Sequence, residues 1–307
     1  MRIVFFGTPE FAVPSLETLL RLGVTVVAVV TQPDRPRGRS RSTLEPPPVK
    51  VRALAAGIPV LQPERPTGPE FLDLCRGFGA DLGVVVAYGH LLRPALLGIP
   101  RLGMINVHAS LLPRWRGAAP IQWAVAHGDP TTGVTIMRME VGLDSGPVLL
   151  AKETPIGPTD TGGELTARLG TLGAVALHEA IDRFRNGTAV FQPQDSSRVT
   201  LAPKIGREVA RIDWTKPADD VANGIRAFDP VPGSWTTLAG RHLKCFAPRP
   251  VKGNGRPGTV LWLSPGLVVA AGTEAVAIGQ VQPAGKPRMN TLDWLRGRPL
   301  AIGDQLG

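Results

Sequence analysis

The sequence predicts an α/β fold, in which a mostly parallel β-sheet with flanking helices is followed by a small antiparallel β-barrel. Four short apolar runs near the N-terminus lack polar alternation, which is typical of parallel strands that helices cover on both faces. Stretches with apolar residues at helical spacing lie between and after these runs. The last third of the chain instead contains short strand-like runs that Gly and Pro separate. The predicted parallel strands are residues 2–6, 24–30, 82–87 and 104–108.

The first predicted helix follows the opening strand directly. Thr8 is a suitable N-cap, Pro9 suits the first helical position, and Gly23 lies just beyond the end. This helix returns the chain to the second strand, so the first three elements form a strand-helix-strand crossover. A further helix is predicted over residues 161–184, where apolar residues recur at helical spacing before Asn186. These features predict a Rossmann-like sheet.

A change of composition divides the chain into domains. Residues 191–207 are polar and interrupted by proline, which predicts a linker. The preceding residues 1–190 hold the predicted sheet, and residues 208–307 hold the barrel. Short connections that contain Gly or Pro join the strands of the barrel, as in small OB-like barrels. The predicted barrel strands are residues 243–246, 259–263, 267–271 and 275–281.

The chain of 307 residues carries a formal net charge of +9, and this charge is uneven. Residues 204–307 contain 14 Lys and Arg against 8 Asp and Glu, whereas residues 1–203 contain 20 against 17. Such a balance favours association with a polyanion such as a nucleic acid. A basic surface that serves only solubility gives the same composition, so charge alone leaves both interpretations open.

The sequence indicates a cytoplasmic protein. Cys75 and Cys245 are the only cysteines, too few for a disulfide framework or a cysteine metal cluster. The chain begins with an apolar strand and no charged leader, and its apolar runs are far shorter than the ~20 residues of a membrane helix. The loop after the first strand has one glycine, Gly7, where a dinucleotide-binding loop has three. The sequence therefore does not favour a nicotinamide or flavin cofactor.

Residues 104–108 place an amide and an imidazole on one face of a strand. Side chains alternate along a strand, so Asn106 and His108 point the same way. An isolated histidine is more often a core residue bonded to backbone, but this strand ends at a loop rich in Pro and Gly, where open parallel sheets bind ligands. Asn106 is also unfavourable inside an apolar strand unless it has a role. The pair predicts a reaction centre.

A third candidate is Asp144, which has a glycine two residues away on either side. By itself this pattern is typical of a carboxylate that caps a turn. Near His108, a carboxylate favours the cationic imidazole and fixes its orientation. We therefore predict catalytic roles for Asn106, His108 and Asp144.

Four arginines alternate in the loop that follows the second strand. Because Gly and Pro interrupt this loop, a regular helix is not expected, and we predict a cationic loop above the ligand-binding edge of the sheet. Such a loop suits the phosphates of a nucleic acid, although a solvated surface loop explains the same residues. The arginines are Arg35, Arg37, Arg39 and Arg41.

The residues around the reaction centre resemble the folate-dependent formyltransferases, in the stretches 106–122 and 133–146. Narrower similarity to the methionyl-tRNA formyltransferases, the tRNA-dependent branch, lies at residues 31–36, 202–205, 210–214, 225–228 and 282–286. The resemblance implies transfer of a formyl group from 10-formyltetrahydrofolate to the α-amino group of methionyl initiator tRNA, for translation initiation. It also implies a monomer that needs no metal.

The resemblance assigns roles along the chain, with residues 1–190 as the catalytic domain and residues 208–307 as a tRNA-binding barrel. Asn106 then stabilises the oxyanion, His108 donates to that oxygen or moves a proton, and Asp144 holds His108. The folate-binding residues that it implies are Val86, Tyr88, Gly89, Ser110, Leu111, Leu112 and Pro113. The tRNA-binding residues that it implies are Arg37, Arg39, Arg41 and Lys204.

Four positions in the linker and barrel depart from the pattern of that family. They are Leu201 in place of an aromatic residue, Val209 in place of an acid, Asp229 in place of Asn, and Val231 in place of Trp. Two alternatives stay open. A formyltransferase for a nucleotide-linked amino sugar shares the reaction centre but does not need the arginine loop, and a non-catalytic RNA-binding protein does not explain the reaction centre.

Overall fold

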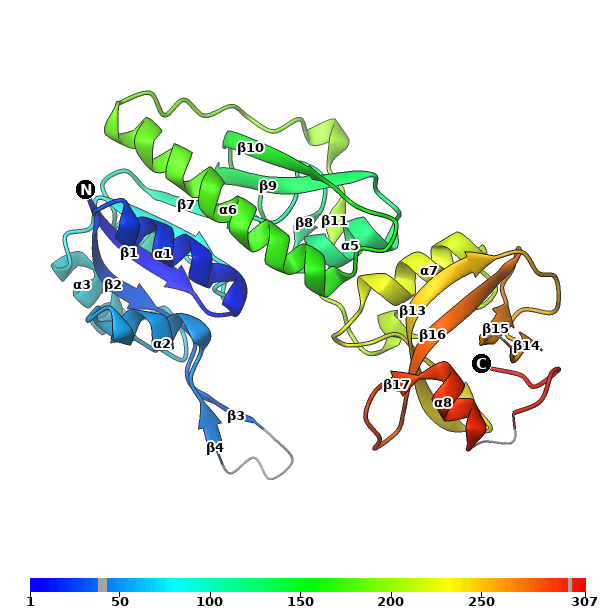
Figure 1. Ribbon diagram of the computed structural model, residues 1–307. Helices are drawn as coiled ribbons and strands as arrows, with labels where there is room; N and C mark the ends of the chain where they lie inside the picture. The colour runs from blue at the N-terminus through cyan, green and yellow to red at the C-terminus, as the bar shows by residue number, and fades with distance from the viewer. Residues whose placement is uncertain (38–42, 265, 298–299) are drawn as a thin grey trace. The chain divides into compact units, whose positions relative to one another are not determined.

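The computed structural model describes residues 1–37, 43–264, 266–297 and 300–307, and the chain forms two compact units (Figure 1). Unit 1 comprises Met1–Gly117, Gly133–Thr154 and Thr166–Leu201. Unit 2 comprises Ala118–Thr132, Pro155–Leu165 and Ala202–Gly307. The C-terminal part of the chain therefore forms one unit with two short segments from earlier in the sequence.

Unit 1 is built on a seven-stranded sheet in the order β10-β9-β7-β6-β1-β2-β5. β1 pairs in parallel with β2 and β6, β6 pairs in parallel with β7, and β9 runs antiparallel to β7. The predicted mostly parallel sheet is confirmed, and its four predicted strands correspond to β1, β2, β6 and β7. The strands are β1 (Arg2–Gly7), β2 (Thr25–Val30), β5 (Val60–Leu61), β6 (Leu82–Val86), β7 (Met104–His108), β9 (Thr131–Arg138) and β10 (Val148–Pro155).

Both faces of this sheet are covered, since consecutive residues of β1 are buried from Ile3 onward. On one face, Val4 and Phe6 pack in a core with Cys75 of α3. On the other, α6 lies close to β7, because a Cβ added at Gly173 would lie 2.9 Å from a methyl carbon of Val107. The helices of this part of the chain are α1 (Val13–Arg21), α2 (Pro48–Ala55), α3 (Pro69–Gly77), α4 (Pro94–Leu97) and α6 (Gly162–Arg185).

The first helix begins later than the sequence predicts. Pro9 precedes the 3-10 turn η1 (Glu10–Ala12), and α1 starts only at Val13. Thr8 does not cap a helix, because its hydroxyl donates to the carbonyl of Tyr88 over 3.1 Å. The local pattern predicts that the Thr8 hydroxyl caps the helix. In the structure it instead bonds to a carbonyl that lies 80 residues away in the sequence.

Unit 2 contains a curled antiparallel sheet in the order β12-β13-β16-β15-β14, with β17 paired to β16. Helix α7 contributes Val221 and Ile225 to the core of this sheet, beside Cys245 and Ile278. The predicted barrel strands fall in β13, β14, β15 and β16. The elements are α5 (Pro120–Ala126), η3 (Glu208–Ala210), α7 (Ala218–Ala227), β12 (Trp235–Leu238), β13 (Arg241–Val251), β14 (Val260–Trp262), β15 (Leu267–Ala270), β16 (Ala275–Pro283), β17 (Met289–Asn290) and α8 (Thr291–Arg296).

The remaining elements are short. A hairpin of β3 (Arg35–Arg37) and β4 (Thr43–Glu45) follows β2 and is visible at the lower left of Figure 1. Two further strands and a 3-10 turn complete the chain: β8 (Arg116–Gly117), β11 (Leu201–Ala202) and η2 (Ser196–Arg198). Within the described ranges, no helix is both long and apolar enough to cross a membrane.

Candidate active site

The candidate site lies at the carboxyl end of β7, which carries Asn106 and His108 on one face. Asn106 is opposite Val85 of β6 and Met137 of β9, so the amide stands at the centre of three paired strands. His108 is buried, with 5% of its surface exposed, whereas Asn106 is only half-buried. Asn106 is therefore the more accessible of these two side chains.

Two groups face the ring nitrogens of His108. Nε2 lies 2.9 Å from the backbone carbonyl of Trp115, and Nδ1 lies 3.7 Å from Oδ2 of Asp144. A carbonyl oxygen only accepts hydrogen bonds, so Nε2 carries a proton in either charge state of the ring. Nδ1 faces the carboxylate with a lone pair when the ring is neutral and with an N–H when it is protonated. The Asp144 carboxylate therefore faces the ring nitrogen that the Trp115 carbonyl does not engage.

Asp144 lies in a loop with unusual backbone geometry. Its φ of 48° and the φ of 139° at Gly142 are both positive. Oδ2 accepts a hydrogen bond of 2.8 Å from the backbone N–H of Gly117. Asp144 thus faces both the imidazole of His108 and the segment that follows Trp115. Asn106 lies on the same face of β7 as His108, two residues earlier.

Gln194 also belongs to this site, and the sequence analysis did not identify it. Its Nε2 donates to the carbonyls of Asp144 (2.9 Å) and Gly146 (2.7 Å). Its Oε1 accepts from Nε and Nη2 of Arg116, at 3.0 and 2.7 Å. Gln194 lies in the stretch that the composition marks as a linker, so no local signal distinguishes it.

Two hydroxyl side chains, one from the turn itself and one from β9, hold the turn after β7. The hydroxyl of Ser110 is fully buried and donates to the carbonyl of Arg114 over 2.6 Å. Thr135 of β9 donates to the Ser110 carbonyl and accepts from the N–H of Leu112, at 2.7 and 3.1 Å. Ser110 therefore shapes the turn from inside. The half-buried residues are those after it, Leu111, Leu112 and Pro113.

The end of β6 adjoins the reaction centre through the pairing of β6 with β7. Val86 is fully buried, and the Tyr88 ring packs edge-on against Phe6, with centroids 5.4 Å apart. Burial raises the pKa of the Tyr88 phenol to about 12. The Tyr88 carbonyl accepts from Thr8 and from Nε2 of Gln32 (3.0 Å), so two side chains already occupy this carbonyl. Gly89 has a φ of 87° and stands against the Gln32 amide.

The predicted tRNA-binding residues are spread along the chain. Arg37 is the last residue of β3, and Lys204 is exposed in unit 2. Arg39 and Arg41 lie outside the described residues.

The base of the hairpin is held by Asp34, which accepts from Lys50 at 2.7 Å and from Gln62 at 2.7 Å. These two donors hold the pKa of the Asp34 carboxyl below its usual value.

Unit 2 contains a cationic cluster that the sequence analysis missed. Arg207, Trp235, His242 and Lys244 line a cavity of about 330 Å³, together with Pro232 and Gly233. The guanidinium carbon of Arg207 lies 5.3 Å from the Trp235 ring centroid and that of Arg211 lies 5.7 Å from it. Nη2 of Arg207 is 2.8 Å from Nε2 of His242. Cations from two separate segments, residues 207–211 and β13, thus meet around one indole.

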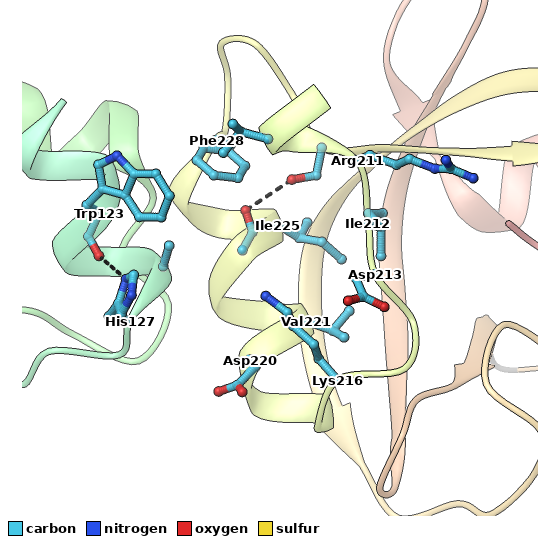
Figure 2. Close-up of a pocket in the computed structure, with 14 residues that line it drawn as sticks. Trp123, His127, Arg211, Ile212, Asp213, Lys216, Asp220, Val221, Ile225 and Phe228 are labelled. Atoms are coloured by element: carbon cyan, nitrogen blue, oxygen red, sulfur yellow. Dashed lines mark hydrogen bonds between the residues drawn. The ribbon is translucent and has the colours of Figure 1, made fainter. Parts of the chain in front are cut away.

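A second cavity in unit 2, of about 310 Å³, lies between α5, α7 and the segment before α7 (Figure 2). Trp123 and His127 come from α5 and its C-terminal end, and they face Ile225 of α7 and Phe228, which follows that helix. The charged residues of the lining are Arg211, Asp213, Lys216 and Asp220, so basic and acidic groups balance. No residue of the predicted reaction centre lines this cavity.

Two family models match the chain. The model described as formyl transferase matches residues 1–181, and the model described as formyl transferase, C-terminal domain, matches residues 204–299. The chain is 48% identical over 308 residues to the methionyl-tRNA formyltransferase of Citrifermentans bemidjiense, which covers 100% of this chain and 96% of the relative. It is 48% identical over 305 residues to the methionyl-tRNA formyltransferase of Myxococcus xanthus, with coverage of 99% and 97%. The chain belongs to the methionyl-tRNA formyltransferase family.

Two solved structures share the fold of this chain. An N-formyltransferase from Helicobacter canadensis, in complex with folinic acid and dTDP-3-aminofucose, matches with a TM-score of 0.67 at 16% identity, covering 90% of this chain and 98% of that one. HypX from Aquifex aeolicus, in complex with tetrahydrofolic acid, matches with a TM-score of 0.64 at 17% identity, covering 100% of this chain and 50% of that one. At these identities the likeness shows the fold alone.

The structure accounts for one of the four departures from the pattern of the methionyl-tRNA formyltransferase family. Asp229 is buried and accepts two hydrogen bonds from Arg288, at 2.7 and 2.9 Å. An acid at this position therefore pairs with a neighbouring cation. Leu201, Val209 and Val231 have exposed side chains, and nothing in the structure explains them.

Proposed function

We propose that the chain transfers the formyl group of 10-formyltetrahydrofolate to the α-amino group of methionyl initiator tRNA. The observation that carries the proposal is the convergence of Asn106, His108 and Asp144 at the end of β7, in a chain whose full-length relatives are named methionyl-tRNA formyltransferases. The product serves translation initiation, so we place the enzyme in the cytoplasm and expect it to act as a monomer without a metal.

In the proposed reaction the amine nitrogen bonds to the formyl carbon, and the bond from that carbon to N10 of the folate then breaks. Negative charge develops on the formyl oxygen between these two events. The Asn106 amide is the donor that we assign to this oxygen, because it is partly exposed at the centre of the sheet edge. Removal of a comparable donor in a protease costs about 2.7–4 kcal/mol of barrier.

The amine loses a proton in this reaction, and N10 gains one. We assign the transfer to His108, which uses Nδ1 because Nε2 is occupied by the Trp115 carbonyl. The 3.7 Å between Nδ1 and Asp144 exceeds a hydrogen bond, so this nitrogen is not committed to the carboxylate. Asp144 stabilises the imidazolium that forms when the ring holds the proton.

The roles of the substrate-binding residues follow the same proposal. Leu111, Leu112 and Pro113 are placed to contact the folate, while the buried residues Ser110, Val86 and Tyr88 support that wall from inside. Gly89 is exposed, and we assign it to the surface of the folate site. Residues 1–190 act as the catalytic domain, residues 191–207 as the linker, and residues 208–307 as the tRNA-binding barrel. We assign tRNA contacts to Arg37, Arg39, Arg41 and Lys204, and to the cationic cluster around Trp235.

Formylation by the purified full-length chain tests this function. With 10-formyltetrahydrofolate present, methionyl initiator tRNA should be formylated and a dTDP-linked amino sugar should not. Formylation of the sugar nucleotide alone would assign the chain to the other substrate class. Binding of tRNA without any folate-dependent turnover would contradict the proposal and indicate a non-catalytic RNA-binding protein.

A further inference from the structure

The two ring nitrogens of His108 face two separate segments of the chain. The first segment, residues 115–117, supplies the Trp115 carbonyl that accepts from Nε2. The second, residues 144–146, supplies the Asp144 carboxylate that faces Nδ1. The environment of the imidazole therefore depends on how these two segments are placed relative to each other.

Gln194 forms hydrogen bonds with both segments through one side-chain amide. Its Nε2 uses both of its hydrogens on the second segment, at the carbonyls of Asp144 and Gly146. Its Oε1 accepts two hydrogen bonds from the guanidinium of Arg116 in the first segment. In this half-buried amide both N–H donors of Nε2 meet carbonyl oxygens, and the acceptor Oε1 meets guanidinium N–H groups.

The backbone of both segments is strained at the residues that meet His108. Trp115 has a φ of 64° and Asp144 a φ of 48°, a left-handed conformation that L residues rarely adopt. Such residues persist only where their surroundings hold them. Gln194 donates to the carbonyl of Asp144 itself, so it acts on the peptide group whose conformation directs the carboxylate.

We propose that Gln194 is a positioning residue for catalysis, which holds the Asp144 carboxylate opposite His108 by joining residues 144–146 to Arg116. The inference rests on the proposed function, in which His108 and Asp144 handle the proton. If the residue only stabilised the fold, its substitution would lower the stability of the protein without changing the surroundings of His108 Nδ1.

The substitution Gln194→Glu tests the proposal, with Gln192→Glu as its control. A carboxylate at position 194 keeps the shape and the acceptors for Arg116, but it cannot donate to the carbonyls of Asp144 and Gly146. Gln192 is exposed and pairs with Val148 through its backbone, so the same charge is added two residues away without touching the site. Gln194→Met, a neutral side chain of similar length, removes both kinds of hydrogen bond.

We expect Gln194→Glu to lower kcat about 10²-fold with KM values nearly unchanged, since small displacements of catalytic groups have effects of this size. Nitrogen NMR of labelled histidine, assigned with His108→Gln, should show that the His108 Nδ1 signal moves in Gln194→Glu and stays in Gln192→Glu. An unmoved signal with unchanged kcat would overturn the proposal. Failure of both Gln194 variants to fold would also overturn it, because the side chain would then serve the fold.

The NMR measurement separates this inference from the proposed function. If the unmodified chain formylates no tRNA, the proposed function fails. The His108 signal still reports whether Gln194 sets its surroundings, because this readout needs no turnover.

Discussion

The imidazole of His108 donates from Nε2 to the backbone carbonyl of Trp115 over 2.9 Å. This bond fixes the tautomer, because the carbonyl cannot donate in return. Proton exchange at His108 is consequently left to Nδ1, the nitrogen that faces Asp144. The carboxylate is thus the group whose charge most directly affects the protonated ring.

Asp144→Asn should lower kcat for formyl transfer roughly 10²-fold or more, the range of a lost acid-base group. The amide keeps an oxygen for the Gly117 N–H but loses the charge that faces Nδ1. Asp73→Asn, on an exposed carboxylate of α3, is the matched control. Retention of activity within a few fold of the parent would remove Asp144 from the mechanism.

Asn106→Ala should lower kcat about 10²- to 10³-fold, because it removes the donor assigned to the developing oxyanion. Single-turnover formylation measures the chemical step directly. Asn186→Ala, at an exposed position after α6, should leave the rate unchanged. Equal rates in the two variants would contradict the assignment of the donor.

The charge-neutralising variant Arg207→Ala should weaken tRNA binding and make its dependence on salt shallower by about one unit of log–log slope. The reason is that Arg207 belongs to the cationic cluster around Trp235. Arg256→Ala changes an exposed arginine elsewhere in unit 2 and serves as control. Folate binding should be equal in all three proteins, and identical salt slopes would rule out the cluster as a tRNA contact.

Arg288→Ala should destabilise the protein more than Asp229→Asn does. Removal of the arginine leaves a buried carboxylate without its partner, which costs about 3–5 kcal/mol. Asn at position 229 instead stays neutral, and the Arg288 side chain, 35% exposed, can reach water. Urea unfolding compares the two, with Arg249→Ala, at an exposed position of β13, as control. The reverse order would show that the ion pair does not determine this part of the fold.

Stability should fall as the pH rises above 9. Burial raises the pKa of the Cys75 thiol from 9.0 to about 11 and that of Cys245 to about 12. At a pH between 9 and the raised pKa, each thiol keeps its proton in the folded chain and loses it in the unfolded chain. The free energy of unfolding therefore decreases as the pH rises. Each thiol contributes about 1.4 kcal/mol per pH unit in this range. Urea unfolding at pH 8 and pH 10 should show a smaller loss in Cys245→Ala than in the parent, and equal losses would contradict the shift.

Local patterns in the sequence were sufficient to place two of the proposed catalytic side chains on one strand face. Asn106 and His108 share a face because alternation along a strand is a property of the extended backbone itself. The parallel strands were predicted for a similar reason, since a run buried on both faces needs apolar residues at every position. The same local reasoning failed at Thr8, whose hydroxyl bonds to the distant Tyr88 carbonyl and not to a helix terminus.

The sequence by itself therefore determined the mostly parallel sheet and the antiparallel sheet that follows it, and it pointed to the three groups that we propose as the reaction centre. Only the tertiary structure decided which groups surround them: the Trp115 carbonyl on Nε2 of His108, Gln194 between Arg116 and Asp144, and Arg288 on Asp229. The physical reason is the range of the interactions. Strand and helix patterns arise from neighbours along the chain, whereas a buried polar group takes whichever complementary partner the folded chain brings within hydrogen-bonding distance.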